Sequence, residues 1–240
     1  MNAKYHRFGL WCGILFIGLF GSSLMNLMGF IPPPSPTLTG PELVARYQEH
    51  LYGIRFSIIV GYAAATFSAP WSVLLFIYMA RIEGGRYPML SMASLSCGIL
   101  NAVAFCLPYI CWGTAIYRME RDPETIRMLN DTAWLLFVML YPPFVIQIAS
   151  IGWVGLTDKS PTPTFPRWFC FLSFWAAILI LPGALAVFFL TGPFAWNGLL
   201  SFWIPVGAFA ISVTDFAHNH GRSQFRRHKR TLSSVSHHHQ

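Results

Sequence analysis

Six apolar runs, each about as long as a bilayer-spanning helix, follow one another along this chain of 240 residues. A helix needs roughly 20 apolar residues to cross the hydrocarbon core of a membrane. Only 10% of the residues are Lys, Arg, Asp or Glu, against about 25% in an ordinary soluble domain. The pattern therefore predicts an all-α fold, a six-helix transmembrane bundle. The runs cover residues 8–30, 57–80, 89–117, 131–156, 168–190 and 197–216.

The placement of Lys and Arg predicts how this bundle is oriented. With the N-terminus inside, eleven of the 16 Lys and Arg residues fall in inner segments, and five fall in outer segments that also hold six acidic residues. Cytoplasmic loops carry an excess of Lys and Arg, so we expect both termini to be cytoplasmic. We read the first run as a retained span, with a cleaved signal peptide as the alternative.

The chain divides into a six-span transmembrane domain, residues 1–220, and a basic disordered cytoplasmic tail, residues 221–240. Positive charge in such a tail is attracted to anionic lipid headgroups. A simpler role as a topology determinant remains open. We expect the lipid bilayer, and no nucleic acid, as a partner of this segment.

Two charged outer segments carry helix-start signals. Thr39 precedes a Pro and an early acid, Glu42, and Asp122 precedes Pro123; both patterns are typical of a capped helix N-terminus. Glu124 and Arg127 are spaced to share a helix face. We expect two short outer interfacial helices, which either form a lid over the bundle or only tether long loops.

Small residues recur at every fourth position in the second and third runs. Such stripes let helix backbones approach closely inside a membrane, and the short loop between the runs makes the two helices antiparallel neighbours. We therefore expect the stripes to face each other. They consist of Ser57, Gly61, Ala65 and Ala69 in one run, and Ser94, Gly98, Ala102 and Cys106 in the other.

Prolines fall at a similar depth in five of the six runs. Each removes a helical hydrogen bond and can kink its helix, so a shared depth indicates an internal cavity in the outer half of the bundle. Membrane helices also tolerate proline for purely structural reasons. The residues are Pro70, Pro108, Pro142, Pro143, Pro182 and Pro205.

The sequence lacks the residues that several familiar kinds of intramembrane chemistry require. Every histidine lies outside the hydrophobic runs or at their edge, and no run holds a lysine. The chain thus lacks the paired core histidines of a b-type haem site, the histidine clusters of a membrane di-iron enzyme and the lysine of a retinal Schiff base. The five cysteines lie in or beside apolar runs and are predicted to be free thiols. We expect no cofactor.

One polar group near the inner end of the sixth run remains as a possible metal site. Asp215 and His218 share a helix face if the helix continues, and His220 follows closely; carboxylate and imidazole groups are zinc ligands. In the alternative interpretation, Asp215 pairs with Arg81 or Arg222 and the histidines lie at headgroup level.

Two amides, Asn101 and Gln147, lie near the middle of the third and fourth runs. Buried amides join membrane helices or contact a ligand. With the aromatic residues Trp134, Tyr141 and Phe144 they form our candidate ligand-binding set.

Five short strings stand out: Phe30-Ile31-Pro32-Pro33-Pro34, Arg81-Ile82-Glu83-Gly84-Gly85, Glu120-Arg121-Asp122-Pro123-Glu124, Phe165-Pro166-Arg167-Trp168 and Thr191-Gly192-Pro193-Phe194-Ala195-Trp196. Together they resemble a group of uncharacterised bacterial polytopic integral membrane proteins with no assigned activity. The resemblance covers most of the chain. It implies a multi-pass protein of the bacterial cytoplasmic membrane and brings no catalytic residues.

Three functional hypotheses follow. The first, which we favour, is a non-enzymatic bundle that binds or transports a lipophilic small molecule. The second is a membrane enzyme that uses interfacial residues, either Glu120, Asp122, Asp131 and His50 outside or the Asp215 group inside. The third is an accessory subunit whose membrane protein partner holds the activity.

Overall fold

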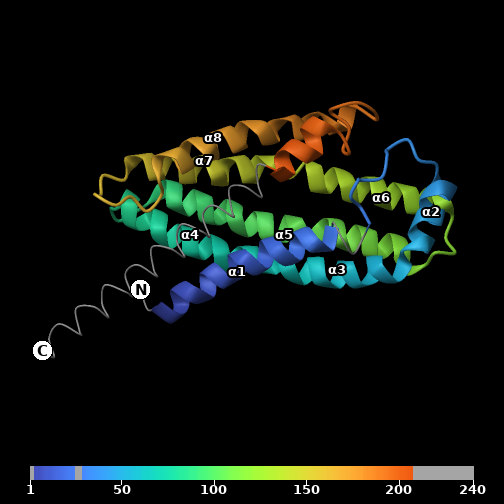
Figure 1. The fold of residues 1–240 in the computed structure, drawn as a ribbon, viewed down its shortest axis with the longest axis horizontal. Helices are drawn as coiled ribbons and strands as arrows, with labels where there is room; N and C mark the ends of the chain where they lie inside the picture. The colour runs from blue at the N-terminus through green and yellow to red at the C-terminus, as the bar shows by residue number, and fades with distance from the viewer. Residues whose placement is uncertain (1–2, 25–28, 208–240) are drawn as a thin grey trace, which may run out of the picture.

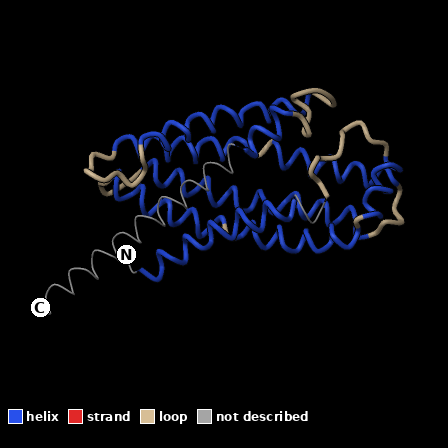
Figure 2. Tube along the Cα trace, viewed as in Figure 1, coloured by secondary structure: helices blue, strands red, loops and turns tan. Residues whose placement is uncertain are grey.

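The computed structural model describes residues 3–24 and 29–207, and within these ranges it is helical without any strand (Figures 1 and 2). Helix α1 is Ala3–Ser22, and α2 (Gly40–Glu49) is followed directly by α3 (Leu51–Thr66) and α4 (Ser68–Glu83). The remaining elements are α5 (Met89–Tyr117), α6 (Pro123–Val138), α7 (Tyr141–Thr157), α8 (Arg167–Ile180), the 3-10 helix η2 (Leu181–Phe188) and the π-helical turn η3 (Leu199–Trp203).

Four segments of the described chain are long and apolar enough to cross a membrane: Leu51–Glu83, Met89–Tyr117, Pro123–Thr157 and Arg167–Phe188. They correspond to the second to fifth predicted runs and support a membrane protein. The first predicted run corresponds to α1 and the residues after it. Part of the sixth, residues 197–207, is described and begins with a loop and η3; the rest lies outside the described residues, as does the tail.

Helix α5 is the centre of the arrangement. It packs against α3 and α4 on one side and against α6 and α7 on the other, and α8 packs on α7 (Figure 1). Helix α1 lies across α3 and α4. Helix α5 runs without a break through Pro108, whereas the α3–α4 and α6–α7 segments that pack on it are interrupted.

Three of the long segments are interrupted partway along. The α3–α4 segment breaks at Phe67, the α6–α7 segment breaks at Met139 and Leu140, and α8 tightens into a 3-10 helix at Leu181. A proline follows each break within a few residues: Pro70, Pro142 and Pro182. Proline at the start of a helix is favourable, whereas inside a helix it removes a hydrogen bond, which explains why the helices restart at these points.

The expectation of two separate outer helices was only half right. The α2 helix forms at the predicted capping residue. The second predicted helix is instead the first part of α6, which runs without interruption from Pro123 to Val138. No Gly or Pro lies between Pro123 and Pro142, so a helix that begins at the Asp122 cap has no reason to stop at the membrane edge.

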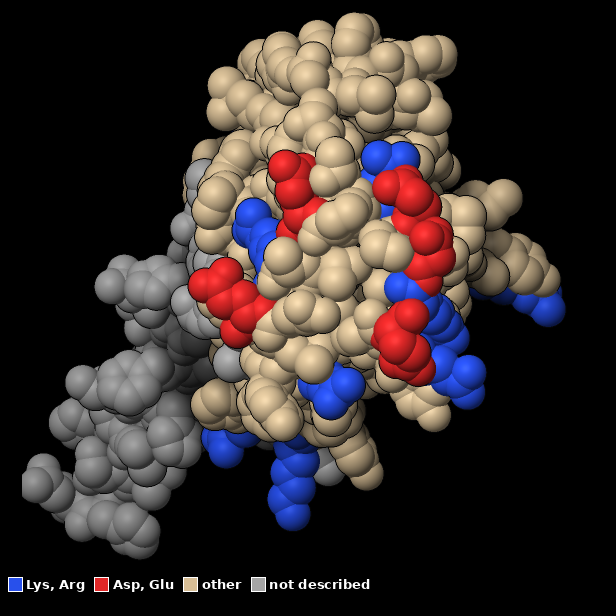
Figure 3. All heavy atoms as spheres, turned by 90° about the vertical axis from the view of Figure 1, so that its right-hand side faces the viewer, with Lys and Arg blue, Asp and Glu red and all other residues tan. Residues whose placement is uncertain are grey.

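The two ends of the bundle differ in charge. Figure 3 views the end formed by α2 and the 118–122 loop, where acidic side chains gather beside several arginines. Six acidic residues belong to this end: Glu42, Glu49, Glu120, Asp122, Glu124 and Asp131. The opposite end, formed by the start of α1 and the 84–88 and 158–166 loops (Figure 1), carries Lys4, Arg7, Arg81, Arg86, Lys159 and Arg167.

Candidate functional site

A cavity lies between α1, α5, α6, α7 and the segment around η3. Its volume is about 410 Å³, and its wall is mainly aliphatic and aromatic. Ser22, Tyr141 and Ser201 are its polar members, and no charged side chain of the described residues lines it. We call it the large cavity. Five phenylalanines contribute to it: Phe20, Phe105, Phe137, Phe144 and Phe202.

The large cavity is found where the helices break. Val138, Leu140 and Tyr141, from the interruption between α6 and α7, line it, and Ile180 at the end of α8 and Pro205 complete that side. Gly183 of η2 closes the wall behind, because a Cβ atom there would lie 2.6 Å from the Val138 carbonyl oxygen. Of the six prolines from which a cavity was expected, only Pro205 lines this space, Pro142 and Pro182 follow the breaks beside it, and Pro108 lies inside the uninterrupted α5.

Two glycines of α1 shape the opposite wall. Gly18 and Gly21 line the cavity, and a Cβ atom built on either one meets nothing within 4 Å. The wall is bare backbone at these positions. Gly18 is exposed and Gly21 is half-buried, and a larger side chain at either position would meet no clash at its Cβ.

A second cavity of about 70 Å³, which we call the small cavity, holds the buried amides. Asn101 of α5 donates from Nδ2 to Gln147 Oε1 of α7 at 2.9 Å. Gln147 Nε2 donates in turn to Ser72 Oγ of α4 at 3.1 Å. The chain of hydrogen bonds therefore joins three helices at the level of the small cavity, as sequence reasoning expected of helix-joining amides.

Gly98 permits this close meeting. A Cβ atom on Gly98 would lie 2.3 Å from Ser72 Oγ and 2.5 Å from Gln147 Nε2. In the predicted facing stripe, Gly61 is likewise filled from across the interface: its Cβ would lie 2.2 Å from the Tyr109 ring. The glycines of each stripe thus receive polar or aromatic side chains from the opposite segment rather than the opposite backbone.

Phe105 and Phe144 belong to the walls of both cavities. Their ring centroids are 6.2 Å apart and the rings are nearly perpendicular. Phe105 also contacts the rings of Phe16 and Phe20. The ring pair therefore stands at the boundary between the apolar and the polar cavity.

The five predicted ligand-binding residues fall into three places. Asn101 and Gln147 line the small cavity, Tyr141 lines the large one, and Phe144 lines both. Trp134 lines neither. Sequence reasoning missed Phe105 and the other phenylalanines of the large cavity, because a phenylalanine that faces a cavity and one that faces lipid look alike in an apolar run.

Trp134 instead lies inside a fully buried aromatic cluster. Its ring meets that of Trp112 edge to face at 5.2 Å between centroids, with Phe30 and Phe202 on its other sides. Neither indole Nε1 has a hydrogen-bond partner among the described residues. Phe202 also lines the large cavity, so Trp134 supports the cavity wall from behind.

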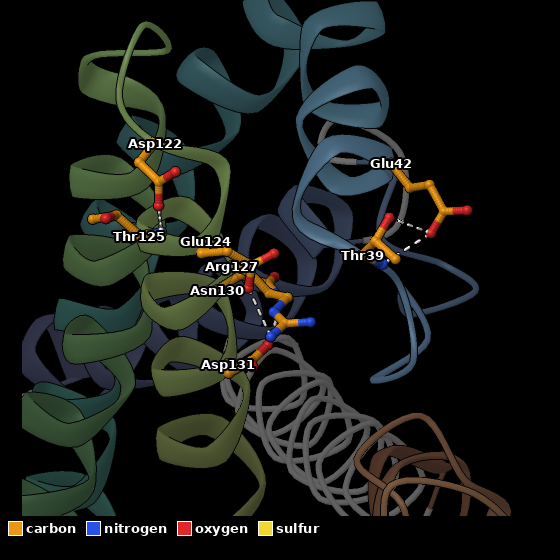
Figure 4. Close-up of polar contacts among 8 residues, drawn as sticks. All are labelled: Thr39, Glu42, Asp122, Glu124, Thr125, Arg127, Asn130 and Asp131. Carbon is orange, nitrogen blue, oxygen red and sulfur yellow. Dashed lines mark hydrogen bonds and ion pairs between the residues drawn. The ribbon is translucent and has the colours of Figure 1, made fainter.

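The end of the bundle formed by α2 and the start of α6 is held together by polar contacts that Figure 4 shows. Asp122 caps α6 by accepting a bond from the Thr125 amide at 3.2 Å, and Arg127 pairs with Glu124 at 2.7 Å. On α2, the Glu42 carboxylate accepts hydrogen bonds from the Thr39 amide and hydroxyl, both at 2.8 Å. These bonds lower the pKa of Glu42.

Helix α2 is fastened to α6 by one buried hydrogen bond. The Tyr47 hydroxyl donates to Asn130 Oδ1 at 2.8 Å, and Asn130 Nδ2 donates to Asp131 at 3.2 Å. Burial raises the pKa of Tyr47, so the hydroxyl stays protonated and remains a donor. Gly40 allows the contact, since a Cβ there would lie 2.8 Å from the Pro123 carbonyl carbon.

Three residues of the enzyme hypothesis, Asp122, Asp131 and His50, have structural partners of their own. Asp122 is a helix cap and Asp131 accepts a bond from Asn130. His50, between α2 and α3, lies 4.0 Å from the carboxylate of its neighbour Glu49. Asp215, His218 and His220 lie outside the described residues. Within residues 3–24 and 29–207, no group of three or more His, Cys, Asp or Glu residues is placed to hold a metal ion.

The fold and its cavities thus define a class: an α-helical protein with four helices of membrane-crossing length and an apolar cavity between them. No protein-family model, no curated protein and no solved structure matches the chain. Its function has to be inferred from its own geometry.

Proposed function

We propose that this chain is a multi-pass membrane protein that binds or transports a lipophilic small molecule, held in the large cavity. The observation that supports this most is the cavity itself. Its 410 Å³ lie within the range of roughly 300–1,000 Å³ that is typical of small-molecule sites. The proposal applies to a ligand that reaches the cavity from the surrounding lipid or through the bundle.

The chemistry of the wall favours an uncharged, apolar occupant. Aromatic and aliphatic side chains surround the space, and no charged side chain of the described residues lines it. Burying apolar surface is favourable by about 25 cal/mol per Å², whereas burying an unpaired charge is strongly unfavourable. A lipophilic molecule gains from entering such a space, and an ion does not.

We further infer six spans with both termini on the cytoplasmic side of a bacterial cytoplasmic membrane. The distribution of charge supports this, because the end at the 84–88 and 158–166 loops is basic and the α2 end is rich in acids (Figures 1 and 3). Cytoplasmic ends of membrane proteins are enriched in Lys and Arg. In this arrangement α2 faces the outside.

Thiol labelling of variants that carry one added cysteine tests the orientation. Glu120→Cys in the 118–122 loop should react with a membrane-impermeant thiol reagent in intact cells. The matched variant Lys159→Cys, in the 158–166 loop, should react only after the cells are opened. The parent chain, whose cysteines lie in helices α1, α5 and α8, gives the background. Reaction of Lys159→Cys but not Glu120→Cys in intact cells would mean the opposite orientation.

Photoaffinity labelling in lipid nanodiscs tests the binding proposal. A long-chain alkyl diazirine should label residues around the large cavity, identified by mass spectrometry of peptides. Gly18→Leu and Gly21→Leu should reduce this labelling, because both glycines line the cavity and a Cβ on either one meets no atom within 4 Å, which leaves room for the larger side chain at the cavity wall.

Gly113→Leu is the matched control for those variants. Gly113 lies on α5, lines neither cavity, and a Cβ there would make only one ordinary contact, at 3.7 Å from Ile58. Its labelling should equal that of the wild type. Labelling that is uniform over the lipid-facing surface, and unaffected by Gly21→Leu, would refute the proposed function.

A further inference from the structure

We propose that the ligand of this protein is a neutral lipophilic molecule with a hydroxyl head group, and that Asn101 is the residue that recognises the hydroxyl. The apolar body occupies the large cavity and the hydroxyl donates a hydrogen bond to Asn101 Oδ1 at the small cavity. This inference rests on the proposed function and adds to it the chemical class of the ligand and a specificity-determining residue.

The direction of the hydrogen-bond chain identifies what the site lacks. Ser72 Oγ donates to the Ser68 carbonyl oxygen at 2.9 Å, and a carbonyl can only accept. Ser72 Oγ therefore accepts from Gln147 Nε2, and Gln147 Oε1 accepts from Asn101 Nδ2. The chain ends at Asn101 Oδ1. Because that end is an acceptor, the missing partner is a hydrogen-bond donor.

Asn101 Oδ1 has no hydrogen-bond partner among the described residues, and the Asn101 side chain is only 2% exposed. A buried polar atom without a partner destabilises its surroundings. The two other serines of the small cavity are already donors to their own helices, Ser68 to Ala65 and Ser173 to Phe169. Neither serine hydroxyl can therefore donate to Asn101 Oδ1, which remains the acceptor without a partner at this cavity.

The polar end and the apolar cavity are one helical turn apart. Phe105 follows Asn101 by four residues on α5, and Phe144 precedes Gln147 by three on α7. Residues at these spacings share a helix face. The perpendicular ring pair of Phe105 and Phe144, which lines both cavities, therefore stands directly between the large cavity and the amides. A single ligand that spans this boundary has its apolar body among the aromatic side chains of the large cavity and its hydroxyl beside the amides.

The head group has to be neutral. Neither cavity is lined by a charged side chain of the described residues. Asn101 lies near the middle of α5, about 18 Å of helix from its start at 1.5 Å per residue. A carboxylate or a phosphate at that depth would be an unpaired charge in an apolar medium. A hydroxyl supplies the required donor without a charge.

Two photoreactive probes of the same chain length test the inference: a long-chain alcohol that carries an aliphatic diazirine, and its methyl ether. Both heads contain an oxygen, but the ether cannot donate a hydrogen bond and carries one additional methyl group. In wild-type protein in nanodiscs, the alcohol should label the large-cavity residues at about tenfold lower concentration than the ether. In Asn101→Leu the two probes should label equally, with the ether unchanged as a measure of folding. Ser96→Ala, on the same helix but outside both cavities, should preserve the difference.

The outcomes separate this inference from the proposed function. Equal labelling by alcohol and ether in the wild type overturns the role of Asn101 and indicates that a water molecule donates to its Oδ1. Labelling of the cavity by both probes would still support a lipophilic ligand. Labelling of the cavity by neither probe overturns both. The wild-type comparison decides even if Asn101→Leu does not fold, because it needs no variant.

Discussion

Phe105 of α5 and Phe144 of α7 meet edge to face, 6.2 Å apart, and each lines the large and the small cavity. This pair connects the two features that set the bundle apart from a set of lipid-facing helices. On one side is apolar space left by broken helices, and on the other is a chain of amide hydrogen bonds. Because both rings line both cavities, a single ligand beside the ring pair can contact the apolar space and the amides.

Removing the Phe105 ring should destabilise the bundle. Phe105→Ala deletes contacts with Phe16, Phe20 and Phe144 and leaves additional empty space where the two cavities meet, so we expect a loss of about 3 kcal/mol in the free energy of unfolding. Phe188→Ala, at a position 76% exposed, is the control and should change stability by less than about 0.5 kcal/mol. Unfolding in detergent, followed by tryptophan fluorescence, measures both. Equal effects of the two variants would contradict a packed ring pair.

Filling the space at Gly98 should break the amide network. In Gly98→Leu the new side chain overlaps Ser72 and Gln147, so we expect a destabilisation of at least about 1–3 kcal/mol, or no folded protein. Gly113→Leu makes the same change on the same helix where space is available and should be tolerated. Size-exclusion profiles and melting temperatures of the two variants give the answer. Normal assembly of Gly98→Leu would show that α4, α5 and α7 do not meet as closely as described.

The Tyr47–Asn130 hydrogen bond should control how firmly α2 is held. Tyr47→Phe leaves Asn130 Oδ1 without its buried partner, which costs about 1–3 kcal/mol. Hydrogen exchange of the α2 amides should accelerate accordingly. Tyr52→Phe, at a tyrosine that is 85% exposed, provides the comparison and should leave exchange unchanged. An unaltered α2 in Tyr47→Phe would mean that apolar packing alone holds the helix.

The Glu42 cap should make α2 sensitive to acid. Because hydrogen bonds from Thr39 lower the pKa of Glu42 in the folded state, the ionised carboxylate stabilises the cap above the unfolded-state pKa. That contribution is lost as the pH falls through the lowered folded-state pKa. Glu42→Gln should therefore destabilise α2 at neutral pH, and its difference from the wild type should shrink at an acidic pH below the usual glutamate pKa, as the carboxylate of the wild type becomes protonated.

Exchange rates of the α2 amides at the two pH values measure the effect. Glu49→Gln, at the other end of the same helix, is the matched control, because it removes the same charge away from the cap. A Glu42→Gln difference that persists unchanged at low pH would rule out a role for the carboxylate charge.

Much of the helical arrangement could be predicted from local signals. The 89–117 run matches α5 residue for residue, since Pro88 and the charged 118–122 segment mark its limits. The Thr39 and Asp122 caps were also predicted, because capping depends on neighbouring residues in the chain. The prediction of a separate short helix after Asp122 was wrong, because no residue in the following sequence stops α6 and hydropathy alone does not mark a helix end.

The candidate site could be predicted only in part. Asn101 and Gln147 stand out as amides in apolar runs, and their pairing follows from helix contacts. Trp134 was chosen with them, yet it lies in the aromatic cluster behind the wall. Which aromatic residues face a cavity depends on the rotation of each helix and on where it breaks. Those are properties of tertiary packing, and no pattern within one run specifies them.

A density map of the protein in lipid nanodiscs tests the central claim most directly. The account predicts elongated, non-protein density in the space bounded by Phe20, Phe137 and Phe202, ending near Phe105 and Phe144, and its absence in Gly21→Leu. A wild-type map in which protein side chains fill this space, with helices α6 and α7 packed against α1, would contradict it.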